Sequence, residues 1–169
     1  LEPEQTTLQE KAALLKALVM GQHVLIFGHT GTGKSAISMD LIANDLRLHP
    51  YQMALNANTT VGDLWGRPVV ADGVTTWEPS PLLLAMDDGS GVGHPIVLDD
   101  IGKPRHQAVV SVINNVLQFG EITTPYGVVR AKPGFRVIAT TTPEESLYAA
   151  NELSGEVEDR FLLLHFGWL

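Results

Sequence analysis

The chain has 169 residues, 44% of them hydrophobic, which is enough for one ordinary domain with a substantial core. It has no cysteine, which excludes disulfides, thiolate zinc sites and a thiol nucleophile, and its six histidines form no H-x-x-x-H pair, so oxygens would have to bind any metal. Eleven Lys and Arg residues against 19 Asp and Glu residues give a formal charge of −8 without a basic run, which disfavours nucleic acid as a partner.

The hydropathy pattern of the chain bears on where the protein is expected to be found. No run of about 18 apolar residues predicts a membrane span, and the N-terminal segment lacks the pattern of a signal peptide. We therefore expect a soluble, cytoplasmic protein in which residues 1–169 form one domain. Because the chain begins with Leu1 rather than Met and stops at the strand-like "FLLLHFGWL", we interpret it as an excised piece.

The first predicted elements are a helix and a strand. Thr7 and Glu10 have the spacing of a capping box at the start of a helix, and Gly21 is placed to end it. "HVLIF" at 23–27 then predicts a short buried strand, and "SAISMDLIANDLRLH" at 35–49 predicts a second helix with Ile37, Leu41, Asn44 and Leu48 on one face.

Between that strand and helix, "GHTGTGKS" at 28–35 matches the phosphate-binding pattern G-x-x-x-x-G-K-[ST]. Glycines allow a tight loop whose backbone N–H groups approach phosphate oxygens, Lys34 can reach the terminal phosphates, and Ser35 offers a hydroxyl to magnesium. A chance match is the alternative, and the strand-loop-helix context argues against it. The predicted nucleotide-binding residues are His29, Thr30, Gly31, Thr32, Gly33, Lys34 and Ser35.

Further strands are predicted at 51–57, 95–100, 135–141 and 160–168, and a helix at 104–119 with Pro104 in its first turn and Gly120 after its end. Short apolar strands that alternate with helices predict a parallel sheet covered on both faces. Two segments interrupt this alternation, at 67–79 around Asp72-Gly73 and at 121–131 around Pro125-Tyr126-Gly127, and both have the pattern of β-hairpins.

The strand "PIVLDD" ends in two carboxylates. In a parallel sheet this end meets the phosphate loop, so Asp99 is the expected magnesium ligand together with Ser35, and Asp100 stands where a base or water-positioning carboxylate would act. The alternative is that two acidic residues simply end a strand and begin a turn.

Four motifs in this order resemble an AAA+ ATPase of the MoxR type over residues 6–169: the phosphate loop, "IVLDDIGKPRHQ", "FGEITTPYGVVRAKPGFRVIATTTPEE" and "ELSGEVEDRF". The resemblance implies a three-layer P-loop NTPase domain with a five-stranded parallel sheet in the order 5-1-4-3-2 and two inserted hairpins. It also implies that Asp99 is the magnesium aspartate, that Thr142 occupies the polar sensor position, and that Arg160 is an arginine finger.

The resemblance further implies binding of ATP with Mg²⁺, assembly into a ring expected to be a hexamer, and remodelling of a protein client by the hairpins, in some families with a partner that carries a von Willebrand factor A domain. Three departures bear on hydrolysis: Asp100 stands where the family has Glu, Thr142 where it has Asn, and the C-terminal helical lid is missing. The function predicted is ATP hydrolysis, with turnover weakened by these departures.

Two other functions remain open. The first is a nucleotide-dependent assembly or switch module with little turnover, because a carboxylate one methylene shorter than Glu can fail to reach the attacking water. The second is a GTPase. The chain has no guanine-reading Asn-Lys-x-Asp motif, which argues against this function, but some AAA+ relatives use GTP.

Overall fold

The computed structural model describes residues 3–28, 33–142 and 160–167. Its centre is a parallel sheet of five strands: β1 (His23–Phe27), β2 (Tyr51–Ala54), β5 (Pro95–Asp99), β8 (Arg136–Thr141) and β9 (Phe161–His165). The strands lie in the order β2-β5-β8-β1-β9. When these five strands are numbered 1 to 5 along the chain and the sheet is read from β9 to β2, the order is 5-1-4-3-2. The predicted fold class and strand order are therefore confirmed.

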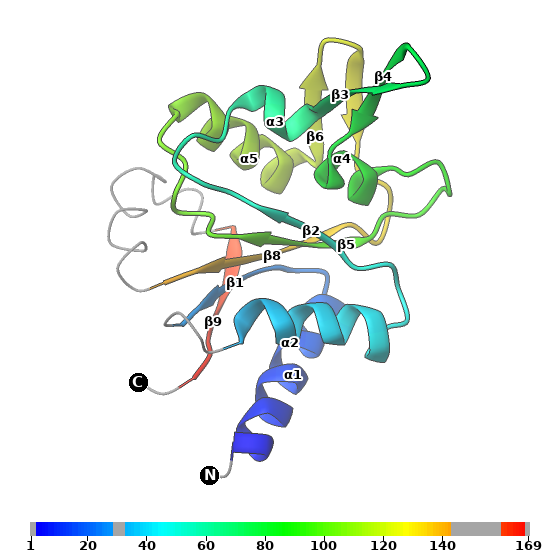
Figure 1. Ribbon diagram of the computed structural model, residues 1–169. Coiled ribbons are helices and arrows are strands. Elements are labelled where there is room, and N and C mark those ends of the chain that lie inside the picture. The colour runs from blue at the N-terminus through cyan, green and yellow to red at the C-terminus, as the bar shows by residue number, and fades with distance from the viewer. Residues whose placement is uncertain (1–2, 29–32, 143–159, 168–169) are drawn as a thin grey trace.

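Helices cover both faces of the sheet (Figure 1). One face carries α1 (Pro3–Val19), α2 (Lys34–Asp40) and a π-helical turn, η1 (Leu41–Asp45). The other carries α3 (Val61–Trp65), α4 (Pro81–Met86) and α5 (Gln107–Phe119). In the part of the chain that the structure describes, no helix has the length and apolar character needed to cross a membrane.

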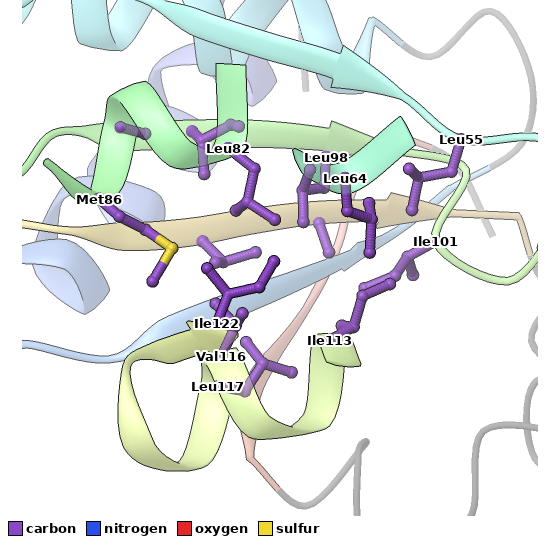
Figure 2. Close-up of a cluster of buried hydrophobic side chains, with 14 of the residues drawn as sticks. Leu55, Leu64, Leu82, Met86, Leu98, Ile101, Ile113, Val116, Leu117 and Ile122 are labelled. Carbon is purple, nitrogen blue, oxygen red and sulfur yellow. The ribbon is translucent and has the colours of Figure 1, made fainter. Parts of the chain in front are cut away.

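The alternation of side chains along each strand divides the core in two. Ile96 and Leu98 of β5 face the α3–α5 side, whereas Val97 faces the α1–α2 side. Figure 2 shows the larger cluster, in which side chains of β5 meet those of α4 and α5. Because successive strand residues point to opposite faces, a strand that is apolar throughout requires a layer on each side, and this produces the three-layer architecture.

Both predicted hairpins are present. The first pairs β3 (Gly66–Ala71) with β4 (Val74–Pro79), and the second pairs β6 (Glu121–Thr124) with β7 (Gly127–Arg130). Asp72 and Gly73 connect the first pair with φ values of 53° and 75°, the positive angles that a tight two-residue hairpin turn requires. The hairpins lie side by side beyond α3–α5, where the rings of Trp77 and Tyr126 are 5.7 Å apart between centroids (Figure 1).

Three helix boundaries differ from the sequence predictions. The predicted helix start at Thr7 is wrong, because α1 begins at Pro3 and Thr7 lies inside the helix. Proline is well suited to the first turn of a helix. The second helix ends at Asp45, so Leu48 lies beyond it. Arg47 takes a left-handed φ of 54°, which interrupts the helix, and Pro50 disfavours a helical conformation in the residue before it.

The third boundary is the start of α5. Pro104 is not in its first turn, because the N–H of Lys103 donates to the Asp100 carbonyl in a separate turn at 3.0 Å, and the helix begins only at Gln107. The predicted apolar face of this helix is otherwise correct: Val109, Ile113, Val116 and Leu117 are buried, and Val112 is partly buried.

His23 begins β1 as a partly buried imidazole. Its Nδ1 accepts a hydrogen bond of 2.9 Å from the backbone N–H of Val137. Burial first, and the charge of Arg136 second, lower the pKa of His23 from 6.5 to about 4. The unfolded chain therefore binds a proton between pH 6.5 and about 4 that the folded protein does not, and the free energy of unfolding falls as the pH falls through this window.

We predict that His23→Asn, which keeps an acceptor near the position of Nδ1 but cannot titrate, loses less stability on acidification than the parent protein. A shift of this size corresponds to about 3 kcal/mol at most between pH 7 and pH 4. Urea unfolding of both proteins at the two pH values measures the difference. An identical pH dependence in the two proteins would contradict the prediction.

Candidate nucleotide-binding site

The candidate site lies at the edge of the sheet where β1, β5 and β8 end, as expected for the carboxyl ends of parallel strands. Gly28 follows β1, and Gly33 precedes α2 with a left-handed φ of 77°, a conformation that glycine adopts without steric cost. His29, Thr30, Gly31 and Thr32 lie outside the described residues, so their predicted contacts with phosphate stay predictions.

Lys34 and Ser35 form the first turn of α2. The Nζ atom of Lys34 donates to the carbonyl oxygen of Gly28, so its ammonium group lies next to the residue that opens the loop. The hydroxyl of Ser35 donates to Oδ1 of Asp99, at the end of β5. Residues 64 positions apart in the chain thus meet, as the sequence predicted for the two halves of the site.

Asp99 ends β5, and its side chain accepts hydrogen bonds from three elements. In addition to Ser35 of α2, the Thr140 hydroxyl of β8 donates to Oδ1 at 2.9 Å, and the Gln52 amide of β2 donates to Oδ2 at 2.6 Å. Asp99 is 9% exposed, and a carboxylate removed from water needs such donors or a cation. The orientation of the Asp99 carboxylate is therefore fixed by donors on both of its oxygens.

Thr140 connects the two acidic residues. While its hydroxyl donates to Asp99, the same oxygen accepts the backbone N–H of Asp100 at 3.2 Å. The carbonyl of Thr140 also accepts the N–H of Ile101 at 3.0 Å, so the backbone that leaves β5 is fixed to β8. Thr140 is 2% exposed, which removes competing water from these bonds.

Asp100 adopts a positive φ of 59°, which is uncommon for a residue other than glycine and turns the chain sharply after β5. Its side chain, 35% exposed, places Oδ2 3.3 Å from Nζ of Lys103. In the described conformation the carboxylate is thus paired with a cation on its own turn.

The two remaining predicted residues lie on neighbouring elements. Thr142 follows the end of β8 and is partly buried. Arg160 precedes β9, and its Nε donates to Oδ1 of Asn114 in α5 at 2.9 Å. The structure thus brings Lys34, Ser35 and Asp99 together at the carboxyl end of the sheet. Asp100 is linked to them through Thr140. Arg160, in contrast, has its described hydrogen bond to α5.

Sequence reasoning missed Gln52 and Thr140. Each lies on a strand that was predicted, but the contact with Asp99 depends on the register of β2 and β8 against β5. The sequence signal that could have indicated these residues was their polarity. Thr140 is a polar residue near the end of an apolar strand, and Gln52 is a polar residue in the strand next to β5.

The residues present fit a magnesium ion. Ser35 and Asp99 offer a hydroxyl and a carboxylate, the hard oxygen ligands that Mg²⁺ prefers. Among the described residues no group of three His, Asp or Glu side chains could hold a metal by itself. Magnesium that is bound with nucleotide needs only one or two protein ligands, since phosphates and waters supply the others.

A parallel sheet with a strand-loop-helix unit, a lysine and a serine at the helix start and a carboxylate on a neighbouring strand defines a P-loop nucleotide-binding domain. Residues 23–161 match the family model described as AAA domain (dynein-related subfamily), and the chain belongs to this family. It is an AAA+ module, and the broader part of the predicted resemblance is confirmed.

The chain is also similar to individual proteins. The chain is 27% identical over 163 residues to von Willebrand factor A domain-containing protein 8 of Mus musculus, a match that covers 88% of this chain and 8% of that protein. A crystal structure of a proposed ATPase from Cytophaga hutchinsonii superposes with a TM-score of 0.69 at 18% identity, covering 99% of this chain and 51% of the other.

A third comparison is with NtrX from Brucella abortus in complex with ADP, with a TM-score of 0.62 and 16% identity over 93% of this chain and 34% of that one. At these identities the two structures show a shared fold. The chain spans about half or less of the length of each of these three proteins.

We predict that Thr140→Val, which keeps the shape of the side chain but removes its hydroxyl, lowers the free energy of unfolding by about 1–3 kcal/mol, because Asp99 loses a donor and the Asp100 N–H loses its acceptor. Thr140→Ser, which keeps the hydroxyl, is the control and should retain most of this energy. Urea unfolding measures both. A Val variant as stable as the Ser variant would show that these hydrogen bonds contribute little.

Proposed function

We propose that residues 1–169 form an AAA+ core domain of the MoxR type that binds ATP with Mg²⁺ and hydrolyses it. The observation that carries the proposal is the hydrogen bond from Ser35 to Asp99, because it joins the phosphate-loop helix to the acidic end of β5 as a magnesium-nucleotide site requires. Family membership and the shared fold with the ADP complex of NtrX support nucleotide binding.

Each residue has a distinct role in this mechanism. Lys34 and the backbone N–H groups of the loop bind the phosphates, while Ser35 and Asp99 hold the magnesium ion. That ion, when bound, neutralises charge on the phosphate oxygens. Asp100 orients the attacking water and accepts its proton, and Thr142 contacts the terminal phosphate.

Asp100 also supports a second candidate function, a nucleotide-dependent assembly or switch module with little turnover. One oxygen of its carboxylate, Oδ2, is paired with Lys103 at 3.3 Å, so the group is already engaged on its own turn. Because the side chain is also one methylene shorter than Glu, a misplacement of about 1 Å would cost about 10²-fold in rate.

We further propose that the module works in a ring, with Arg160 reaching nucleotide bound to the neighbouring subunit. Asn114 holds the Nε of Arg160, so the rest of the guanidinium can be presented to an adjacent molecule. The exposed hairpin residues Val70, Val74 and Tyr126 are suited to contact a protein client. A partner with a von Willebrand factor A domain is consistent with the domain named in the Mus musculus relative.

We predict that Lys34→Ala weakens ATP binding by at least about 10–100-fold, because a charge-assisted contact with the phosphates is removed. Asp100→Asn, the matched variant in the same site, should bind ATP normally and lose turnover. Calorimetry measures binding, phosphate release measures turnover, and circular dichroism checks the fold.

Unchanged affinity in folded Lys34→Ala would contradict the phosphate-loop function. Asp100→Asn as fast as the parent would show that this carboxylate is not catalytic. The variant Asp100→Glu separates the two candidate functions. In a hydrolytic module the longer carboxylate raises the rate of phosphate release or leaves it as high as in the parent. In a switch module the rate is low in the parent and stays low in the variant.

We predict that mixing Arg160→Ala subunits with Lys34→Ala subunits restores part of the ATPase activity, since each lacks a different half of a shared site. A finger of this kind is worth about 10³–10⁵ in rate, so even a small fraction of mixed interfaces is detectable. Mixed assemblies, verified by differently tagged subunits, that stay inactive would argue against action across subunits.

A further inference from the structure

Among the donors to Asp99 in the described part of the chain, Gln52 is the one that belongs to no sequence motif. It donates to Oδ2, whereas Ser35 and Thr140 both donate to Oδ1. We propose that Gln52 is a positioning residue for magnesium: it fixes Oδ2 of Asp99 and so sets the direction in which the carboxylate faces the metal. The inference rests on the proposed function, because it assigns a hydrogen-bond partner to the magnesium ligand proposed above.

The register of the sheet explains how Gln52 reaches Asp99. Ala54 is paired with Asp99 across β2 and β5, and Gln52 is paired with Val97 two residues earlier. Gln52 and Ala54 therefore lie on the same face of β2, and a long side chain at position 52 can reach the diagonal neighbour. Alanine at 54 leaves space for this, since it has only a methyl group.

The chemistry of the amide suits a residue that orients the metal ligand without binding the metal. A carboxylate offers about four lone-pair directions, and the three described donors take two on Oδ1 and one on Oδ2. The remaining direction lies on Oδ2, the oxygen that Gln52 orients. A neutral amide donates this hydrogen bond without bringing a positive charge that would repel Mg²⁺, as lysine or arginine in the same place would.

A purely structural role makes a different prediction. Gln52 is exposed on an edge strand that is already paired with β5 at four positions, so its replacement leaves the core intact. If Gln52 only joined β2 to β5, its loss would lower stability or affect nucleotide binding equally with and without magnesium. A positioning role affects only the part of the binding that depends on magnesium.

The test compares the parent protein with Gln52→Met, which is similar in length but donates no hydrogen bond, and with Gln118→Met, the same change at an exposed position of α5. Affinity for the non-hydrolysable analogue adenylyl imidodiphosphate is measured by calorimetry in excess EDTA and in excess Mg²⁺. The ratio of the two affinities is the magnesium effect. Thermal unfolding of each protein without ligand reports structural damage.

We expect Gln52→Met to reduce the magnesium effect by about 10-fold, up to 100-fold where the parent's effect is large enough, since loss of a residue that hydrogen-bonds to a metal ligand typically costs that much in metal affinity. Affinity in EDTA should match the parent, and Gln118→Met should match it in both conditions. An unchanged magnesium effect in Gln52→Met, or an equal loss in EDTA and in Mg²⁺, would overturn the inference and leave the proposed function standing. A parent protein without any magnesium effect would contradict both.

Discussion

The buried carboxylate of Asp99 is the constraint around which the site is organised. A group that is 9% exposed has lost most of its water, and its charge must be met by donors, by a cation or by both. Three separate elements supply the donors, so the hydrogen bonds of one side chain hold α2, β2 and β8 at fixed positions around the end of β5. The same arrangement that satisfies the buried charge also assembles the oxygen ligands for magnesium.

The three layers explain why this edge is rigid enough for such a site. All five residues of β5 are buried, with Ile96 and Leu98 packed on one side and Val97 on the other. Neither the strand nor its last residue can shift without disturbing both cores, and well-packed cores resist small displacements. On the α1 side, Lys11 pairs with Asp40 and with Asp45, at 3.1 Å from the latter, so α1 is held against the helix that carries Ser35.

Part of this could be predicted from sequence because the signals are local. The phosphate loop, the strand before it and the acidic pair each lie within one short segment, and the alternation of strands with helices gives the three layers. The contacts of Gln52 and Thr140 could not be predicted, since they depend on how non-adjacent strands align. The helix boundaries were predicted wrongly for a different reason, because more than one residue nearby can start a helix or a turn. Thr7 and Pro104 carry valid start signals, but Pro3 begins α1 earlier and the Asp100–Lys103 turn delays α5.

The two hairpins, which the nucleotide site does not use, are nevertheless attached to the same framework. The segment between β7 and β8 is held by hydrogen bonds from the Lys132 N–H to the Met86 carbonyl at 2.8 Å and from the Gly93 N–H to the Pro133 carbonyl at 2.9 Å. Met86 ends α4, the helix that follows the first hairpin, so both hairpins are joined at their bases as well as by the contact of Trp77 with Tyr126.

The second hairpin is also close in sequence to a residue of the candidate site. Thr140, which binds Asp99, is on β8, and β8 begins a few residues after the second hairpin. Motion of one hairpin alone would have to break an aromatic contact worth about 0.5–1.5 kcal/mol and the backbone hydrogen bonds at the base. The two hairpins are therefore held to each other by backbone hydrogen bonds at their bases and by an aromatic contact between their side chains, and the second hairpin leads directly to the strand that carries Thr140.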